Sequence, residues 1–132
     1  EIIKAPKIFF LDTGFRNSIN NNFQDLKKRT DSGYLNENFI ASEISKKNIA
    51  LKYWRTKAGA EVDFILEKEG ELLPIEVKSS LKDINLTRSF QNFIHEYSPK
   101  KSFILSYDFI SKRVDNKTDV EFFPLFYIYN II

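Results

Sequence analysis

A hairpin signal in the middle of the chain constrains the fold more than any other feature. Glu69-Gly70 separates two segments of β character, and glycine tolerates the positive φ of a two-residue turn. With these two residues as the loop, Asp63 faces Glu76 on the neighbouring strand. The same register pairs Lys68 with Glu71, Leu66 with Leu73 and Phe64 with Ile75. The sequence therefore predicts an antiparallel strand pair that places two acids opposite one another.

The two opposed acids need a cation between them. Directly opposed residues have Cβ atoms roughly 4.5–5.5 Å apart, and two carboxylates at that separation repel each other. Lys78 is two residues past Glu76 and projects to the same face. A hard divalent metal ion is the natural candidate for the cation, and the adjacent lysine favours metal-assisted hydrolysis.

A predicted helix over residues 34–47 supplies a third acid. At ~100° per residue, Glu37 falls on the apolar stripe formed by Ile40, Ala41 and Ile44. An ionised carboxylate on an apolar face requires a partner. The candidate site therefore comprises Glu37, Asp63, Glu76 and Lys78.

Composition bounds the class of protein and the type of metal. The 132 residues fit one domain, and 42% hydrophobic with 29% charged residues is typical of a soluble globular protein. The chain has no cysteine and one histidine, His95, which excludes zinc sites built from thiolate and imidazole. Oxygen ligands favour Mg²⁺ or Mn²⁺. The lack of cysteine fits a cytoplasmic location, and no run approaches the ~18 apolar residues of a membrane span.

The charge balance leaves a nucleic-acid partner open. Net charge is +2, from 20 basic and 18 acidic residues. Only local clusters of basic residues can therefore indicate a nucleic-acid partner. Between Ile44 and Ala60 there are basic residues and no acids, interleaved with Tyr53 and Trp54. The candidate DNA contacts in this stretch are Lys52, Arg55 and Lys57. A solvated helix end and strand edge would show the same pattern.

The order of elements indicates an α/β fold with a mixed β-sheet flanked by helices. Strands are expected at residues 7–11, 51–56, 61–67, 72–78, 102–107 and 120–129. A second helix is expected to begin at a cap on Asp83 or Asn85 and to end near Tyr97. Residues 17–22 and 115–117 are expected to be loops. No linker divides the chain, so residues 1–132 are treated as a single domain.

Two motifs give the chain a family resemblance. Residues 59–64, followed by residues 75–80, resemble the PD-(D/E)xK nuclease superfamily. More closely, the chain resembles the C-terminal DUF4143 domain of bacterial and archaeal AAA+-type ATPases. The matching stretches are residues 6–14, 35–39, 53–64 and 74–78. The resemblance implies a restriction-endonuclease-like three-layer fold and a metal-dependent nuclease acting on DNA.

The same resemblance assigns roles to individual residues. Asp63 and Glu76 would be metal ligands on adjacent strands, and Lys78 would activate the attacking water. Glu37 would reach the metal directly or through water, and the Val77 carbonyl would complete the shell. The implied cofactor is Mg²⁺ or Mn²⁺. The chain begins at Glu1, contains no Met and has no G-x-x-x-x-G-K-[ST] loop, so it is expected to be a fragment without its ATPase module.

Three alternatives remain open. In the first, the nuclease fold is catalytically silent and serves as a module for binding DNA or protein; the sequence leaves homo-oligomers open. In the second, the hairpin charges form an ordinary wet face, on which Glu61 pairs with Lys78. Asp12-Thr13-Gly14 has the pattern of an aspartic protease, but the sequence around it favours a turn and a helix cap on Asp12 or Thr13.

Overall fold

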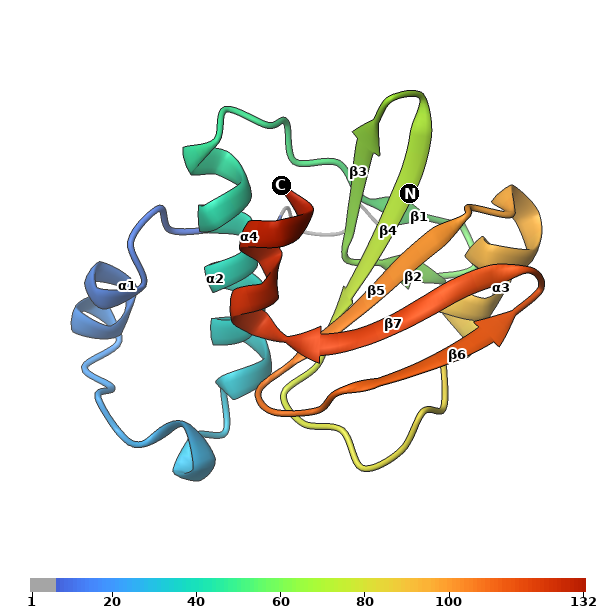
Figure 1. The fold of residues 1–132 in the computed structure, drawn as a ribbon. Coiled ribbons are helices and arrows are strands. Elements are labelled where there is room, and N and C mark those ends of the chain that lie inside the picture. Colours follow the sequence, from blue (N-terminus) through green and yellow to red (C-terminus); the bar gives the residue numbers. More distant parts are fainter. Residues whose placement is uncertain (1–6) are drawn as a thin grey trace.

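Two sheets and the helices packed against them make up the part of the chain that the structure describes, residues 7–132 of a computed structural model (Figure 1). The helical elements are α1 (Thr13–Ile19), η1 (Leu26–Lys28), α2 (Ser32–Lys46), α3 (Arg88–Tyr97), η2 (Leu125–Tyr127) and α4 (Ile128–Ile131). The strands are β1 (Trp54–Arg55), β2 (Glu61–Val62), β3 (Phe64–Lys68), β4 (Glu71–Val77), β5 (Lys101–Ser106), β6 (Ser111–Asp115) and β7 (Thr118–Pro124). None of the described helices is long and apolar enough to cross a membrane.

The main sheet has five strands in the order β3-β4-β5-β7-β6. The three central strands, β4, β5 and β7, run parallel, and the two outer pairs are antiparallel. β1 and β2 form a separate two-stranded antiparallel sheet. The predicted α/β fold with a mixed sheet is confirmed.

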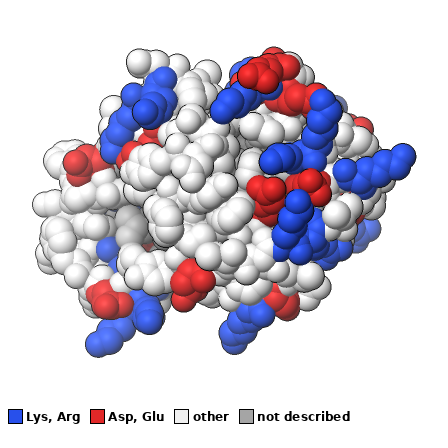
Figure 2. Space-filling view, in the orientation of Figure 1, with Lys and Arg blue, Asp and Glu red and all other residues white. Residues whose placement is uncertain are grey.

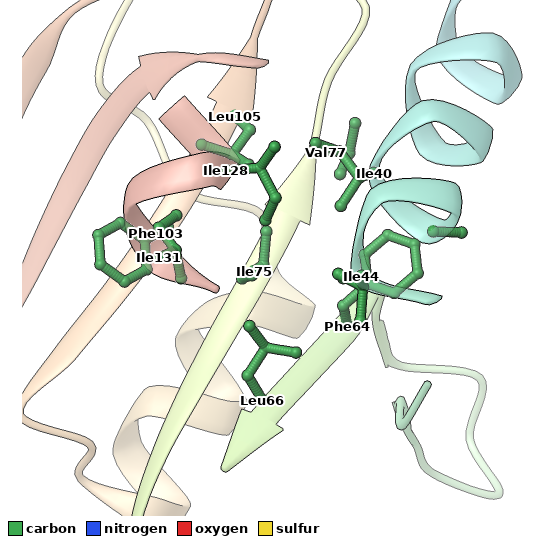
Figure 3. Close-up of a cluster of buried hydrophobic side chains, with 11 residues drawn as sticks. Ile40, Ile44, Phe64, Leu66, Ile75, Val77, Phe103, Leu105, Ile128 and Ile131 are labelled. Atoms are coloured by element: carbon green, nitrogen blue, oxygen red, sulfur yellow. The ribbon is translucent and has the colours of Figure 1, made fainter. Parts of the chain in front are cut away.

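Helices cover both faces of the main sheet (Figure 1). On one face, α2 and α4 pack against alternate residues of the strands, as Figure 3 shows for Ile40 and Ile44 opposite Phe64 and Val77. On the other face, α3 buries Phe90, Phe93 and Ile94 against β2, β3, β5 and β7. Full burial of such a side chain contributes roughly 1.5–3 kcal/mol, so both faces anchor the strands that carry the candidate site.

The predicted hairpin is confirmed in its turn and in the pairing of residues 64–68 with residues 71–75, whereas the expected pair of Asp63 and Glu76 lies beyond the end of the ladder. Glu69 and Gly70 both have positive φ, 54° and 79°, as a two-residue turn of the primed type requires. β3 and β4 pair as expected, with Phe64 opposite Ile75 and Leu66 opposite Leu73. Lys68 lies opposite Glu71.

The expected strand over residues 61–67 is broken at Asp63. Glu61–Val62 belong to β2 and Phe64–Lys68 to β3, and these strands lie in different sheets. Asp63 is a bend whose side chain, at Oδ2, accepts a hydrogen bond from the Val77 backbone N–H at 2.8 Å. A side chain thus replaces the backbone at this point of the ladder, and regular pairing stops.

The expected strand over residues 7–11 was wrong. In the described part of that segment, the backbone of Phe10 bonds to the side chain of Asn38 on α2 instead of to a strand. Asp12 caps α1 by accepting from Phe15 N–H at 2.7 Å, which confirms the cap. α1 also includes Asn17, which was expected to lie in a loop.

Other boundaries also differ from the predictions. The strand expected over residues 51–56 shrinks to β1, and α3 is capped by Thr87 rather than by Asp83 or Asn85. β6 was missed, and it includes Asp115, which was expected to lie in a loop; Asn116 and Lys117 form the tight connection to β7. The strand expected over residues 120–129 ends at Pro124, which cannot donate a ladder hydrogen bond, and η2 and α4 follow.

Candidate functional site

Asp63 connects the two halves of the candidate site. Its hydrogen bond to the Val77 backbone N–H fixes it beside the segment Glu76-Val77-Lys78 at the end of β4. The negative charge of Asp63 helps to raise the pKa of both Glu76 and Glu37. The structure therefore brings together the acids that the sequence placed 13 and 39 residues apart.

Glu76 is the most deeply buried acid of the group, with 5% of the residue exposed. Its Oε1 accepts hydrogen bonds from Lys78 Nζ at 2.6 Å and from Thr87 Oγ1 at 3.2 Å. Its Oε2 is buried and has no hydrogen-bond partner among residues 7–132. Burial, followed by the charge of Asp63, raises the pKa of Glu76 against the opposing effect of Lys78.

Glu37 projects from α2, whose apolar stripe seats the helix on the main sheet. Its carboxylate oxygens lie 3.3 and 3.4 Å from Lys7 Nζ. Burial and the charge of Asp63 raise the pKa of Glu37 to about 6, although Lys7 opposes the shift. Glu37 therefore holds its proton to a higher pH than an exposed glutamate does.

Lys7 is a member of the site that the sequence analysis did not identify. Its ammonium lies 2.6 Å from Glu61 Oε1 and 3.6 Å from Asp63 Oδ1, in addition to its contact with Glu37. Glu61 also binds Arg55 at 2.8 Å, so the expected ion pair between Glu61 and Lys78 was wrong. The reason is that β2 pairs with β1 and not with β4.

The side chains that hold the site in place were missed as well. Asn36 is buried, and its Nδ2 donates to the Lys78 carbonyl at 3.1 Å, which ties α2 to the end of β4. Thr87 caps α3 by accepting from Phe90 N–H while its hydroxyl donates to Glu76. Thr is a favoured N-cap residue, so a search for caps just before Arg88 would have found it.

The oxygen donors of the candidate site suit a hard divalent cation in chemistry but are not yet arranged around one. No three acidic or imidazole side chains of residues 7–132 already stand in an arrangement that could hold a metal ion. The chemistry nevertheless fits, because the ligands on offer are carboxylate oxygens and Glu76 Oε2 lacks a partner. Lys7 provides the positive charge that three of the acids share.

The candidate DNA contacts lie on and beside the small sheet. Lys52 pairs with Glu67 at 2.9 Å, Arg55 pairs with Glu61, and Lys57 is exposed in the turn between β1 and β2. Figure 2 shows basic and acidic side chains interspersed over one face of the molecule. The described residues on that face therefore form no continuous basic surface.

The family can be stated from a comparison of the sequence with family models. The model of the domain of unknown function DUF4143 matches residues 32–125. The chain belongs to the DUF4143 family. The DUF4143 match includes Glu37, Asp63, Glu76 and Lys78, whereas Lys7 precedes it. No curated protein and no solved structure matched the sequence.

Proposed function

We propose that this DUF4143 domain is a metal-dependent nuclease of the PD-(D/E)xK type that hydrolyses phosphodiester bonds of DNA. The observation that carries the proposal is the hydrogen bond between Asp63 and the Val77 backbone, at 2.8 Å. It sets the acid of one segment against the Glu-x-Lys of the other, as a shared metal site between them requires. The proposed partner is an AAA+-type ATPase module on the same polypeptide, and the proposed compartment is the cytoplasm.

Asp63 and Glu76 are the proposed ligands of Mg²⁺ or Mn²⁺, with Glu37 and the Val77 carbonyl as further oxygen donors. The bound ion would supply charge stabilisation at the phosphate and a lowered pKa for a water ligand. Glu76 Oε2 is the oxygen that most needs such a partner, because it is buried and unpaired among the described residues.

Lys78 is the proposed catalytic lysine. Its ammonium is held by Glu76 Oε1 at 2.6 Å, and its side chain remains about one-third exposed, at 32%. It can therefore reach a water or a phosphate oxygen while the carboxylate fixes its position. Its backbone is held from both sides, by Asn36 at the carbonyl and by the Leu105 carbonyl at the N–H.

Lys52, Arg55 and Lys57 are the proposed DNA contacts beside these residues. Arg55 bonds to Glu61 and lies over the ring of Tyr53, 5.4 Å from its centroid. Tyr53 is exposed and suited to stacking on a base. The small sheet can therefore approach a nucleic-acid strand next to the acids.

A second function is favoured by one observation. The Lys7 ammonium already forms ion pairs with Glu37, Glu61 and Asp63, as expected for a nuclease fold that binds DNA or protein without cutting. In that case the acids would form a structural ion-pair network.

Plasmid nicking in the presence of Mg²⁺ or Mn²⁺ decides between the two functions. We expect wild-type protein to nick DNA and Glu76→Gln and Lys78→Met to lose at least ~100-fold in rate. Glu71→Gln is the matched control, because Glu71 lies on the same strand but pairs with Lys100 at its far end. DNA binding without cleavage by wild-type protein would support the silent module. If the wild-type protein neither cuts nor binds DNA, a role in protein binding is favoured.

A further inference from the structure

We propose that the Lys7 ammonium is an internal counter-cation of the acidic site, which a divalent metal ion must displace in order to bind. This inference rests on the proposed metal site and assigns Lys7 a role in setting its affinity for cations. Lys7 would thereby decide whether the site exists in a closed ion-paired form or in a metal-binding form.

The geometry places one ammonium among three carboxylates that come from different elements. Lys7 Nζ lies 2.6 Å from Glu61 on β2, 3.3 Å from Glu37 on α2 and 3.6 Å from Asp63 at the strand break. Two of these acids are proposed to donate oxygen to the metal. The ammonium and a metal ion would therefore compete for oxygens of the same carboxylates, and their positive charges repel each other at close range.

The backbone next to Lys7 is anchored to the core. The ring of Phe9 lies 5.9 Å from that of Phe64. Phe10 donates its N–H to Asn38 Oδ1 at 2.8 Å and accepts from Asn38 Nδ2 at 2.9 Å. Asn38 is only 2% exposed. The placement of Lys7 is therefore fixed by buried contacts a few residues away.

The side chain of Lys7, by contrast, has a route into solvent. It is 37% exposed, more than any of the three acids that it contacts, whose side chains are 14–19% exposed. A lysine has a flexible four-carbon stem. Displacement of the ammonium requires rotation of that stem only, and the anchored backbone can stay in place.

The competition between the Lys7 ammonium and the metal ion is reciprocal. It can therefore be measured first through the affinity for the metal and second through the release of the ammonium. If Lys7 weakens metal binding by a certain factor, metal binding weakens the Lys7 ion pairs by the same factor. Removal of the ammonium should therefore tighten metal binding, and addition of metal should release the ammonium.

Calorimetric titration with Mn²⁺ tests the first side. We expect Lys7→Gln to bind Mn²⁺ about tenfold more tightly than wild type, and Lys7→Arg, which keeps the charge, to remain close to wild type. Lys46→Gln is the matched control, because Lys46 makes a 2.6 Å ion pair with Glu43 away from the site. If Lys7→Gln binds Mn²⁺ as tightly as wild type or more weakly, the inference about Lys7 is overturned, whereas the proposed metal site is not.

Acylation of lysines in the wild-type protein tests the second side and does not depend on the folding of a variant. We expect Mn²⁺ to increase the modification rate of Lys7 severalfold relative to that of Lys46. An unchanged rate at saturating Mn²⁺ would refute displacement. If neither wild type nor Lys7→Gln binds Mn²⁺, the proposed metal site and this inference both fail.

Discussion

The side-chain amide of Asn38 pairs with both backbone groups of Phe10, so that a helix residue serves as the hydrogen-bonding partner that a neighbouring strand would otherwise supply. This explains why the apolar segment around Phe10 is not a strand. It also explains how a segment outside the main sheet can deliver Lys7 to the acids.

Asn38→Ala should release this segment. Truncation leaves an N–H and a carbonyl of Phe10 without partners in a partly buried position, at a cost of about 2 kcal/mol in the free energy of unfolding. Urea denaturation measures the cost, and hydrogen exchange at the Phe10 amide should accelerate. Asn85→Ala, at an exposed position, is the control and should change neither quantity. An unaltered exchange rate in Asn38→Ala would contradict the proposed anchor.

Glu37→Gln should stabilise the protein at neutral pH. The pKa of Glu37 rises from 4.5 to about 6 on folding, so the folded state holds the proton more tightly. Stability from this group is therefore fully present below pH 4.5 and is lost as the pH rises through about 6. The variant should gain about 1 kcal/mol at pH 7.5 and little at pH 4. A variant less stable than wild type at pH 7.5 would show that the ion pair with Lys7 outweighs burial.

The hydroxyl of Thr87 both caps α3 and donates to Glu76. Substitution by valine removes the hydroxyl while nearly preserving the volume of the side chain. Thr87→Val removes the cap of α3 and the hydroxyl donor to Glu76, and should cost about 1 kcal/mol. Thr87→Ser keeps the hydroxyl and should remain within a few tenths of a kcal/mol of wild type. Thermal unfolding of the two variants makes the comparison. A loss in Thr87→Ser as large as that in Thr87→Val would contradict the assignment of the effect to the hydroxyl.

Asp31 should be important for stability at neutral pH but not in acid. It receives two hydrogen bonds, at 2.8 and 2.9 Å, from Arg29, whose side chain is only 1% exposed, and a third from Arg16 at 3.0 Å. Arg29 holds the pKa of Asp31 well below its usual value of 3.8, against the effect of burial, with further help from Arg16. Stability from Asp31 is present above that value and is lost as the pH falls through the lowered pKa.

Asp31→Asn should therefore cost about 3 kcal/mol at pH 7, because it leaves the guanidinium of Arg29 buried without its counter-charge. The difference from wild type should shrink as the pH falls below 3. Chemical denaturation at pH 7 and at pH 2.5 measures both values. Asp25→Asn, at an exposed cap of η1, is the control and should show a smaller effect at both pH values.

The sequence was sufficient where local rules determine structure. The Glu69-Gly70 turn set the register of the hairpin, and with it the approach of Asp63 to the end of β4, where it accepts from the Val77 N–H. The stripe on α2 placed Glu37 correctly, because three residues at helical spacing were buried against the sheet.

The sequence was insufficient where one side chain takes the place of a backbone partner. The break at Asp63 and the position of Phe10 both arise from a hydrogen bond between a side chain and a distant backbone group. Neither bond leaves a periodic pattern in the sequence. Lys7 was missed for the same reason, since its partners lie 30 or more residues away.

Because β4 pairs with β5 in parallel, the final arrangement of the charged residues depends on a strand that comes later in the chain. The backbone N–H of Lys78 is held by the carbonyl of Leu105, so β4 is completed by a strand that carries none of the candidate acids. Glu37, Asp63 and Glu76 all precede β5 in the chain, and the parallel pairing of β4 with β5 must await the crossover through α3. During synthesis these residues therefore leave the ribosome ahead of β5, and they reach their final arrangement only after β5 has emerged.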